Sequence, residues 1–429
     1  MGTDPGAIPV SGPAALHLHR WNDRAVVGVA VAAFASGFGQ FGVVAALGDV
    51  ARGFGQVSHG ASLADQAGLS GTALGIGLAI MRLASLGALL ITGLADDFGR
   101  RRMLLITVGA GLALTVLAAA SPSYWWFVAI FACGRPLLSA SNGLAQVIAA
   151  EQTASADRAK AVALIAAGYG LGAGVIAIVH SLASHAVGFR GVFVLALVPL
   201  ALLPLVGRWV QEPERFTVAV AESGHPIPVL DAVARPFRRR LLVVAVLAFA
   251  ISVITGPANS FGFLFAQNIL HLRGIVTAGM VLGSGIAGLA GLLAGRWLAD
   301  RVGRRLTGAL AMVAVALLAT LTYSGSAAAL LAGYISAVFA ASVFAPAAGA
   351  LINELFPTSV RASVVGWSTA AGVLGAVTGL VAFGAVAGAG DQFGVAGVVT
   401  FLPAALVMVL FWLLPETRGR EPEDLWPES

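Results

Sequence analysis

Apolar runs of about 20 residues recur along the whole chain, and they constrain its fold more than any other feature. The hydrocarbon layer of a bilayer is about 30 Å thick, and a helix crosses it with about 20 apolar residues. Of the 429 residues, 58% are hydrophobic and only 10% are charged. A soluble domain carries roughly 25% charged residues. We therefore predict an all-α membrane protein.

Twelve apolar runs are predicted to be transmembrane helices. The first six cover 25–48, 72–94, 103–121, 124–149, 161–183 and 191–209. The second six cover 241–268, 275–295, 306–325, 328–352, 363–388 and 394–414. The chain then divides into a disordered N-terminal segment (1–24), a first six-helix bundle (25–209), a central loop (210–240), a second six-helix bundle (241–414) and a C-terminal tail (415–429).

The distribution of basic residues predicts the orientation, because loops on the cytoplasmic side are enriched in Lys and Arg. Of the 25 Lys and Arg residues, 20 lie in the segments that share a side with the N-terminus. Arg52, Arg190 and Arg273 lie in the other loops, and Arg82 and Arg135 lie within helices. We expect both termini in the cytoplasm and the protein in the cytoplasmic membrane.

Two motifs occur twice, which indicates an internal repeat. LADDFGRRR (94–102) and LADRVGRRL (298–306) place Asp96 and Asp300 204 residues apart. The spacing E-x6-R occurs at Glu151 and again at Glu354, 203 residues apart. Because six crossings return the chain to its starting side, the two six-helix bundles share one orientation. They are expected to be related by a pseudo-two-fold axis along the membrane normal.

The Asp-x-x-Gly-Arg-Arg loops resemble the signature of the major facilitator superfamily, over about residues 25 to 420. NELFPTSVRASVVGW (353–367), PETRG (415–419) and QEPERF (211–216) look like segments of its sugar-porter, organic-ion and aromatic-acid branches. The resemblance implies a secondary transporter that works by alternating access. It also implies a cavity lined by helices one, four, seven and ten. Gly349 stands where sugar porters carry a tryptophan, which disfavours a hexose substrate.

The repeated loops predict two clusters of charged residues on the cytoplasmic face. Gly99 and Gly303 can adopt positive φ at little cost, and arginine can bind carboxylates with two hydrogen bonds. The first predicted cluster comprises Asp96, Gly99, Arg100, Glu151 and Arg158, and the second comprises Asp300, Gly303, Arg304, Glu354 and Arg361. In the family such clusters latch the two halves together. The alternative is that the arginines only fix the topology of the loops.

Polar residues within the predicted helices are the candidates for solute binding, because ionisable groups in a membrane are costly and usually functional. Helical spacing places them on single faces. They are Ser36 and Gln40 in the first helix, Arg82 in the second, Arg135, Ser139, Asn142 and Gln146 in the fourth, and Ser252, Thr255 and Asn259 in the seventh. The alternative is that these residues form hydrogen bonds between packed helices.

Two central arginines without a central carboxylate favour an anionic solute such as a small carboxylate. We predict proton-coupled symport by a monomer, and an exporter of drugs or metabolites is the alternative. The titratable candidates are peripheral: Asp49, Glu151, Glu354 and His180. No phosphate-binding G-x4-G-K-[ST] loop and no plausible metal cluster occur, so we expect no cofactor, no metal, no nucleic acid and no enzyme activity.

Overall fold

The computed structural model describes residues 18–59, 62–213, 235–388, 392–420 and 426. Within these residues twelve helices are long and apolar enough to cross a membrane. In the first half they are formed by α1 (Arg24–Ala45), α4 (Gly71–Ala84) with α5 (Gly87–Phe98), α6 (Arg100–Ala118), α7 (Tyr124–Gln152), α8 (Ser155–Val194) and α9 (Leu197–Trp209). The fifth and sixth spans meet inside α8 at a kink, where Gly188 has a φ of 62°.

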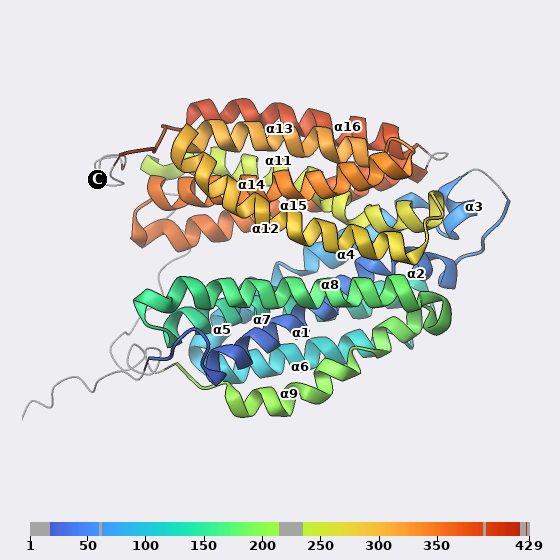
Figure 1. Ribbon diagram of the computed structural model, residues 1–429, viewed down its shortest axis with the longest axis horizontal. Coiled ribbons are helices and arrows are strands. Elements are labelled where there is room, and N and C mark those ends of the chain that lie inside the picture. Colours follow the sequence, from blue (N-terminus) through green and yellow to red (C-terminus); the bar gives the residue numbers. More distant parts are fainter. Residues whose placement is uncertain (1–17, 60–61, 214–234, 389–391, 421–425, 427–429) are drawn as a thin grey trace, which may run out of the picture.

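The second half repeats this order. Its spans are formed by α11 (Arg235–Leu264) with η2 (Phe265–Ile269), α12 (Gly274–Val302), α13 (Arg304–Thr322), α14 (Ala327–Leu355), α15 (Thr358–Gly388) and α16 (Phe393–Ala405) with η3 (Leu406–Leu413). In Figure 1 the two halves lie side by side, blue to green for the first and yellow to red for the second. The twelve-helix fold in two bundles predicted from the sequence is therefore confirmed.

The bundle has two ends, which differ in their loops. The motif face carries the α5–α6 and α12–α13 loops, with Gly99 and Gly303. The opposite face carries two short helices, α2 (Leu47–Phe54) and α3 (Leu63–Ala67), which the sequence did not predict. The start of α1 and the end of η3 (Leu406–Leu413) lie at the same end of the molecule (Figure 1).

Some predicted boundaries differ from the structure. Helix α11 begins at Arg235, within the predicted central loop, and residues 214–234 of that loop lie outside the described residues. Of the N-terminal segment predicted to be disordered, residues 1–17 also lie outside them. Residues 18–23 are described, and the main-chain N–H of His19 donates to the carbonyl of Gln152, 2.8 Å away.

The two halves touch closely at the opposite face, through glycines of α4 and α15. A Cβ on Gly75 would lie 2.5 Å from the carbonyl oxygen of Leu380, and one on Gly384 would lie 2.4 Å from that of Gly71. Gly71 and Gly75 are four residues apart, as are Gly384 and Gly388, which is the small-xxx-small pattern of close helix pairs in membranes. The absence of side chains is thus what lets this face close.

We predict that Gly75→Val opens the opposite face. Overpacking costs roughly 1–3 kcal/mol, so the closed state should lose roughly 5- to 150-fold in population. Spin labels at Gln56 and Ser324, which lie on this face in different halves, should move apart in an electron–electron distance measurement. Gly93→Val is the control, because a Cβ at Gly93 meets no atom within 4 Å. Unchanged distances in Gly75→Val would contradict the role of the glycine contact.

Candidate functional site

A cavity of about 310 Å³ lies between the two halves. Helices α1, α4, α7 and α8 line it from the first half, and α11 and α15 from the second. Its polar lining residues are Gln40, Arg82, Arg135, Tyr169, Ser252, Thr255, Asn259 and Ser260. The rest of the lining is apolar, so a solute here would meet both polar and apolar groups, and two of the polar groups are guanidinium groups.

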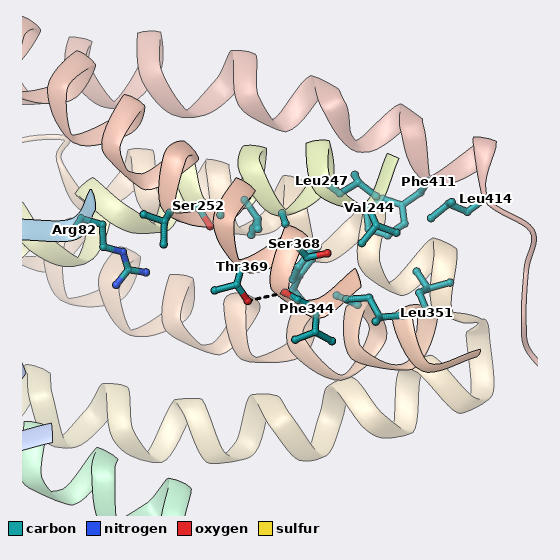
Figure 2. Close-up of a pocket in the computed structure, with 17 residues that line it drawn as sticks. Arg82, Val244, Leu247, Ser252, Phe344, Leu351, Ser368, Thr369, Phe411 and Leu414 are labelled. Carbon is teal, nitrogen blue, oxygen red and sulfur yellow. Dashed lines mark hydrogen bonds between the residues drawn. The ribbon is translucent and has the colours of Figure 1, made fainter. Parts of the chain in front are cut away.

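A second cavity, of about 340 Å³, shares Arg82 and Ser252 with the first and continues toward the motif face. Figure 2 shows Arg82 at one end of it and Leu414 at the other. Its walls are mostly aliphatic and aromatic side chains of α11, α14 and α15. The two cavities thus meet at Arg82 and Ser252, and the second extends from there to Leu414 near the motif face, while the glycine contacts lie at the opposite face.

Arg135 is held in place on the first-half wall of the central cavity. Its Nη1 donates to the main-chain carbonyl of Gln40, 3.1 Å away. Its Nε is buried and has no hydrogen-bond partner among the described residues. A buried donor without a partner costs about 1–3 kcal/mol. Arg135 therefore lines the central cavity with one guanidinium donor unsatisfied among the described residues.

Arg82 comes from α4 and lines both cavities. Within the described part of the chain its side chain makes no hydrogen bond or ion pair, and it is exposed to the cavity space. Neither cavity includes an Asp or a Glu among its described lining residues. The centre of the protein thus carries positive charge from two arginines without a carboxylate in the cavity walls.

The predicted polar residues of α1 join that helix to α7. Ser36 donates to the carbonyl of Leu138 at 2.7 Å, and the Gln40 amide donates to the Ser36 hydroxyl at 3.0 Å. Ser139 donates to Oε1 of Gln40 at 3.4 Å. Of these three predicted residues only Gln40 lines the central cavity. Ser36 and Ser139 instead form hydrogen bonds between packed helices, as the alternative interpretation of the sequence predicted.

Asn142 and Gln146, also predicted from α7, do not line either cavity. Gln146 is exposed, and Oδ1 of Asn142 is buried without a partner among the described residues. Helical spacing gave the right common face for Arg135 and Ser139. It could not show how far along the helix the cavity extends, and a binding role for Asn142 and Gln146 stays a prediction.

The second half contributes neutral polar groups. Thr255 donates to the carbonyl of Ile251 at 3.0 Å, whereas Asn259 is exposed and has no hydrogen bond to a described residue. Sequence reasoning missed Tyr169 and Ser260 in the central cavity and Ser368 and Thr369 in the second. The adjacent Ser368 and Thr369 within the apolar run 363–388 were the available signal for that helix.

The charged residues of the motif face form ion pairs within each half. Arg100 pairs with Glu151 in the first half. In the second half Arg304 pairs with Glu354 at 3.1 Å and with Asp300 at 3.2 Å. The arginine of the repeated loop therefore binds the glutamate that ends the fourth helix of its own half.

The arginines of the E-x6-R motif have other surroundings. Arg361 donates from Nη2 to the carbonyls of Asn353 and Phe356, which stabilises the end of α14. Arg158 is exposed at the start of α8. The side chain of Asp96 lies outside the described residues. A latch between the halves stays a prediction.

A third repeated feature of the motif face was not recognised in the sequence. Oε1 and Oε2 of Glu212 accept from the main-chain N–H groups of Arg100 and Arg101, at 2.6 and 3.0 Å. Glu416 likewise accepts from Arg304 and Arg305, at 3.0 and 3.2 Å. Each carboxylate thus caps the N-terminus of a helix, where the helix dipole favours negative charge.

The loop glycines allow these caps. Gly99 has a φ of 88° and Gly303 a φ of 117°, values that favour glycine. Glu212 and Glu416 are 204 residues apart, as are Asp96 and Asp300. The signal was therefore present in QEPERF and PETRG, but only the structure shows what the two glutamates bind.

The cap at Glu416 has a predictable pH dependence. Burial acts to raise the pKa of Glu416, but the main-chain N–H groups of Arg304, Arg418, Arg305 and Thr417 together lower the pKa below its ordinary value. A lowered pKa stabilises the folded state above the ordinary glutamate pKa of about 4.3. That contribution is lost as the pH falls through the lowered pKa.

We predict that Glu416→Gln weakens the N-terminus of α13 at neutral pH. Loss of a helix cap costs about 1 kcal/mol, so hydrogen exchange at Arg304 and Arg305 should accelerate about fivefold. In the unmodified protein the same acceleration should appear only in acid, below about pH 4.3. Glu212→Gln is the control, because it should affect Arg100 and Arg101 instead. Equal exchange in both variants at all four amides would contradict this role.

The sequence model of the Major Facilitator Superfamily matches residues 29–307 and 286–427. A probable 4-methylmuconolactone transporter of Cupriavidus pinatubonensis is 27% identical over 77% of this chain and 79% of its own. A 3-(3-hydroxy-phenyl)propionate transporter of Escherichia coli is 28% identical over 78% of this chain and 82% of its own. Both similarities extend over most of each protein.

Solved structures share the fold. The xylose transporter XylE of E. coli, in an inward-open conformation, has a TM-score of 0.70 at 17% identity and covers 94% of this chain and 99% of its own. The nucleoside transporter NupG has a TM-score of 0.74 at 15% identity and covers 91% of this chain and 99% of its own. The twelve-helix fold in two halves is thus shared with solved transporter structures.

Proposed function

The chain belongs to the Major Facilitator Superfamily and is a multi-pass membrane transporter of small metabolites, and we propose that it imports an organic carboxylate together with protons. The observation that carries this proposal is the pair Arg82 and Arg135 at a cavity whose described lining includes no carboxylate. Two cations without an anionic partner in that described lining favour a solute that brings its own negative charge.

The geometry supports a carboxylate attached to an apolar body. Guanidinium groups bind carboxylates with two parallel hydrogen bonds, and Nε of Arg135 is a buried donor without a partner among the described residues. Phe41 and Tyr169 offer aromatic surface in the same cavity, and Asn259 offers an amide for a hydroxyl group. A small ring with one carboxylate matches these groups.

The names of the relatives agree with this chemistry. One is called a transporter of 3-(3-hydroxy-phenyl)propionate, which joins an aromatic ring to a carboxylate, and another a transporter of 4-methylmuconolactone. We propose a solute of the same class for this chain. The xylose transporter shares 17% identity and only the fold, and Gly349, where sugar porters carry a tryptophan, disfavours a sugar.

We further propose that the motif face is cytoplasmic and that the protein lies in the cytoplasmic membrane as a monomer. The Lys and Arg residues concentrate on that face, as loops on the cytoplasmic side do. The structure is then open toward the cytoplasm. The Arg100–Glu151 and Arg304–Glu354 pairs lie on this open side, where we propose that they help to close it in the other half of the cycle.

Thermal-shift measurements on the purified protein test the solute class. A ligand that binds only the folded state raises its unfolding temperature. We expect stabilisation by 3-(3-hydroxyphenyl)propionate, much less by its uncharged amide, and none by D-xylose. Stabilisation by D-xylose alone, or equally by the acid and the amide, would rule out recognition through the carboxylate.

We predict that Arg135→Gln weakens carboxylate binding by roughly 30-fold or more, because losing one partner of a buried charged pair costs roughly 2–5 kcal/mol. Arg135→Lys should recover part of the loss, since it keeps the charge but not the forked geometry. Arg208→Gln is the control, because Arg208 is exposed at the end of α9. Calorimetric titration measures all three, and an unaltered affinity in Arg135→Gln would contradict the assignment.

Proton coupling has its own test in proteoliposomes. An inward proton gradient of one pH unit should drive roughly tenfold accumulation of 3-(3-hydroxyphenyl)propionate if one proton moves with each solute. An uncoupler should abolish accumulation but leave exchange of solute for solute. Accumulation that survives the uncoupler would contradict symport.

A further inference from the structure

A third cavity, of about 420 Å³, lies within the first half between α1, α8 and α9 (Figure 1). Every described residue that lines it is a Val, Leu, Ala, Phe, Gly or Pro, and none of them lines either of the other two cavities. Ala32 and Ala35 of α1 are buried in its wall, whereas Leu171 of α8 and Leu202 of α9 are 64% and 48% exposed. We call this cavity the side groove, because exposed side chains border it.

The side groove faces away from the central cavity. Tyr169 and Ala173 of α8 line the central cavity, whereas Leu171, midway between them, lines the side groove. Two residues turn an α-helix by about 200°, so α8 presents opposite faces to the two cavities. In a chain that spans a bilayer, an exposed apolar face directed away from the other half contacts lipid tails.

The length of the side groove matches one leaflet of a bilayer. Its α1 wall extends from Val27 to Phe38. At a rise of 1.5 Å per residue this distance is about 16 Å, and half of the hydrocarbon layer is about 15 Å thick. Because α1 begins at the motif face, the groove runs through the leaflet on that side.

Two cations lie at the motif-face end of the side groove. Arg24 precedes Val27 by three residues, and Lys160 precedes Leu164 by four. These spacings place each cation on the groove face of its own helix. Arg24 is exposed and makes no hydrogen bond or ion pair with a described residue.

The two cations lie at nearly the same depth, because α1 and α8 pack in parallel. A Cβ on Gly168 would lie 2.6 Å from the carbonyl oxygen of Ala30, and one on Gly172 would lie 2.0 Å from that of Phe34. Each contact joins residues 138 positions apart. Lys160 is therefore level with residue 22 of the chain, about 3 Å along the helix axis from the residue that begins α1.

Trp209 lies near the same end of the side groove. It follows Val206 of the groove by three residues on α9, and a Cβ on Gly28 would lie 2.9 Å from Cβ of Trp209. Tryptophan is enriched where lipid headgroups meet the hydrocarbon. Arg24 lies one turn before Gly28 and is thus at the depth of the headgroups.

The carboxylates near the two cations do not use all of their donors. Nζ of Lys160 donates to Oδ1 of Asp157 at 3.0 Å, but an ammonium group has three hydrogens to donate. Asp23, next to Arg24, accepts from the main-chain N–H of Arg20 at 2.8 Å and lies 3.4 Å from Nδ1 of His19. Both cations therefore have donors for a further anion.

We propose that the side groove binds an anionic phospholipid, with one acyl chain along the groove and the phosphate at Arg24 and Lys160. An apolar groove of one leaflet's length, with cations at headgroup depth, matches both parts of such a lipid. A transported carboxylate would meet no polar side chain in the groove, and a second copy of the chain would bring no phosphate to the cations. This proposal goes beyond the transport function and does not depend on the solute.

Native mass spectrometry of the purified protein tests the headgroup site. Dissociation constants are measured for phosphatidylglycerol and for phosphatidylethanolamine with the same acyl chains. We expect phosphatidylglycerol to bind more tightly, because it carries a net negative charge. Arg24→Gln combined with Lys160→Gln should weaken its binding about 25-fold, since each basic residue near a lipid surface contributes about fivefold. Arg238→Gln combined with Arg239→Gln is the control, because both arginines are exposed at the start of α11.

Photo-crosslinking tests the position of the acyl chain. Phosphatidylglycerol with a diazirine in the middle of its acyl chain should form adducts with α1, α8 and α9. Ala167→Phe should reduce these adducts, because Ala167 is exposed and lines the groove. Ala166→Phe is the matched control, because Ala166 is also exposed but lines none of the three cavities.

Equal affinities for the two lipids, or unchanged phosphatidylglycerol binding in the variant of Arg24 and Lys160, would overturn the proposal. Adducts confined to other helices would also overturn it. A dimer that forms through α8 and α9, without lipid adducts in the groove, would assign the side groove to a second copy of the chain instead.

Discussion

Two six-helix bundles surrounded by lipid gain little from hiding apolar surface against each other, because lipid tails are as apolar as the side chains they would replace. What holds the halves together must come from close packing and from polar contacts. In this protein the closest approach is made by glycines, Gly71 and Gly75 against Gly384 and Gly388. Contacts of this kind are specific in geometry but modest in energy, so the two halves can separate there.

The lipid surroundings also explain where the arginines of the cavity lie. A guanidinium group in hydrocarbon is costly, and it is tolerated where it faces a partner or a polar cavity. Arg135 has both, a carbonyl from Gln40 and a position on the cavity wall. Because the described lining provides no carboxylate, the positive charge remains incompletely compensated in the empty protein. An anionic solute would complete the site, and its binding would favour the conformation that encloses both arginines.

The sequence predicted those features of the structure that depend on a short stretch of the chain and on one physical rule. Hydrocarbon thickness sets the minimum length of every span, so the twelve helices could be predicted from apolar runs. Most predicted ends lie within a few residues of the observed ones, but α11 begins at Arg235 rather than 241 and α12 ends at Val302 rather than 295, because both helices continue into charged segments beyond the apolar run. The repeated LAD motifs likewise revealed the duplication. Contacts between segments far apart in the sequence could not be predicted in this way. The caps at Glu212 and Glu416 join residues more than 100 positions from their partners, and no local pattern states which amides a glutamate will bind.

Which residues of a helix line the cavity was harder to predict from the sequence than where the helix begins and ends. Periodicity placed Arg135, Ser139, Asn142 and Gln146 on one face, but only Arg135 among them lines the central cavity. Depth along a helix depends on where the other half approaches, which is a property of the whole fold. The short helices α2 and α3 were missed for a related reason. They are not long apolar runs, and α2 packs against α8 and α11 rather than crossing the membrane.

The two halves share the charged residues of the motif face but not the ionisable residues of the central cavity. Arg100, Glu151 and Glu212 have equivalents in Arg304, Glu354 and Glu416, with the same contacts.

The charged groups deeper in the first half have no such copies. The repeat offset of 204 residues relates Arg82 to Ile286 and Arg135 to Phe339, both exposed apolar side chains. It also relates His180 to Gly384, one of the glycines that close the opposite face. The first half therefore carries both arginines of the central cavity, while the second supplies neutral polar groups and close backbone contacts. In the proposed transport cycle, movement of one bundle against the other would then leave both arginines within the same half.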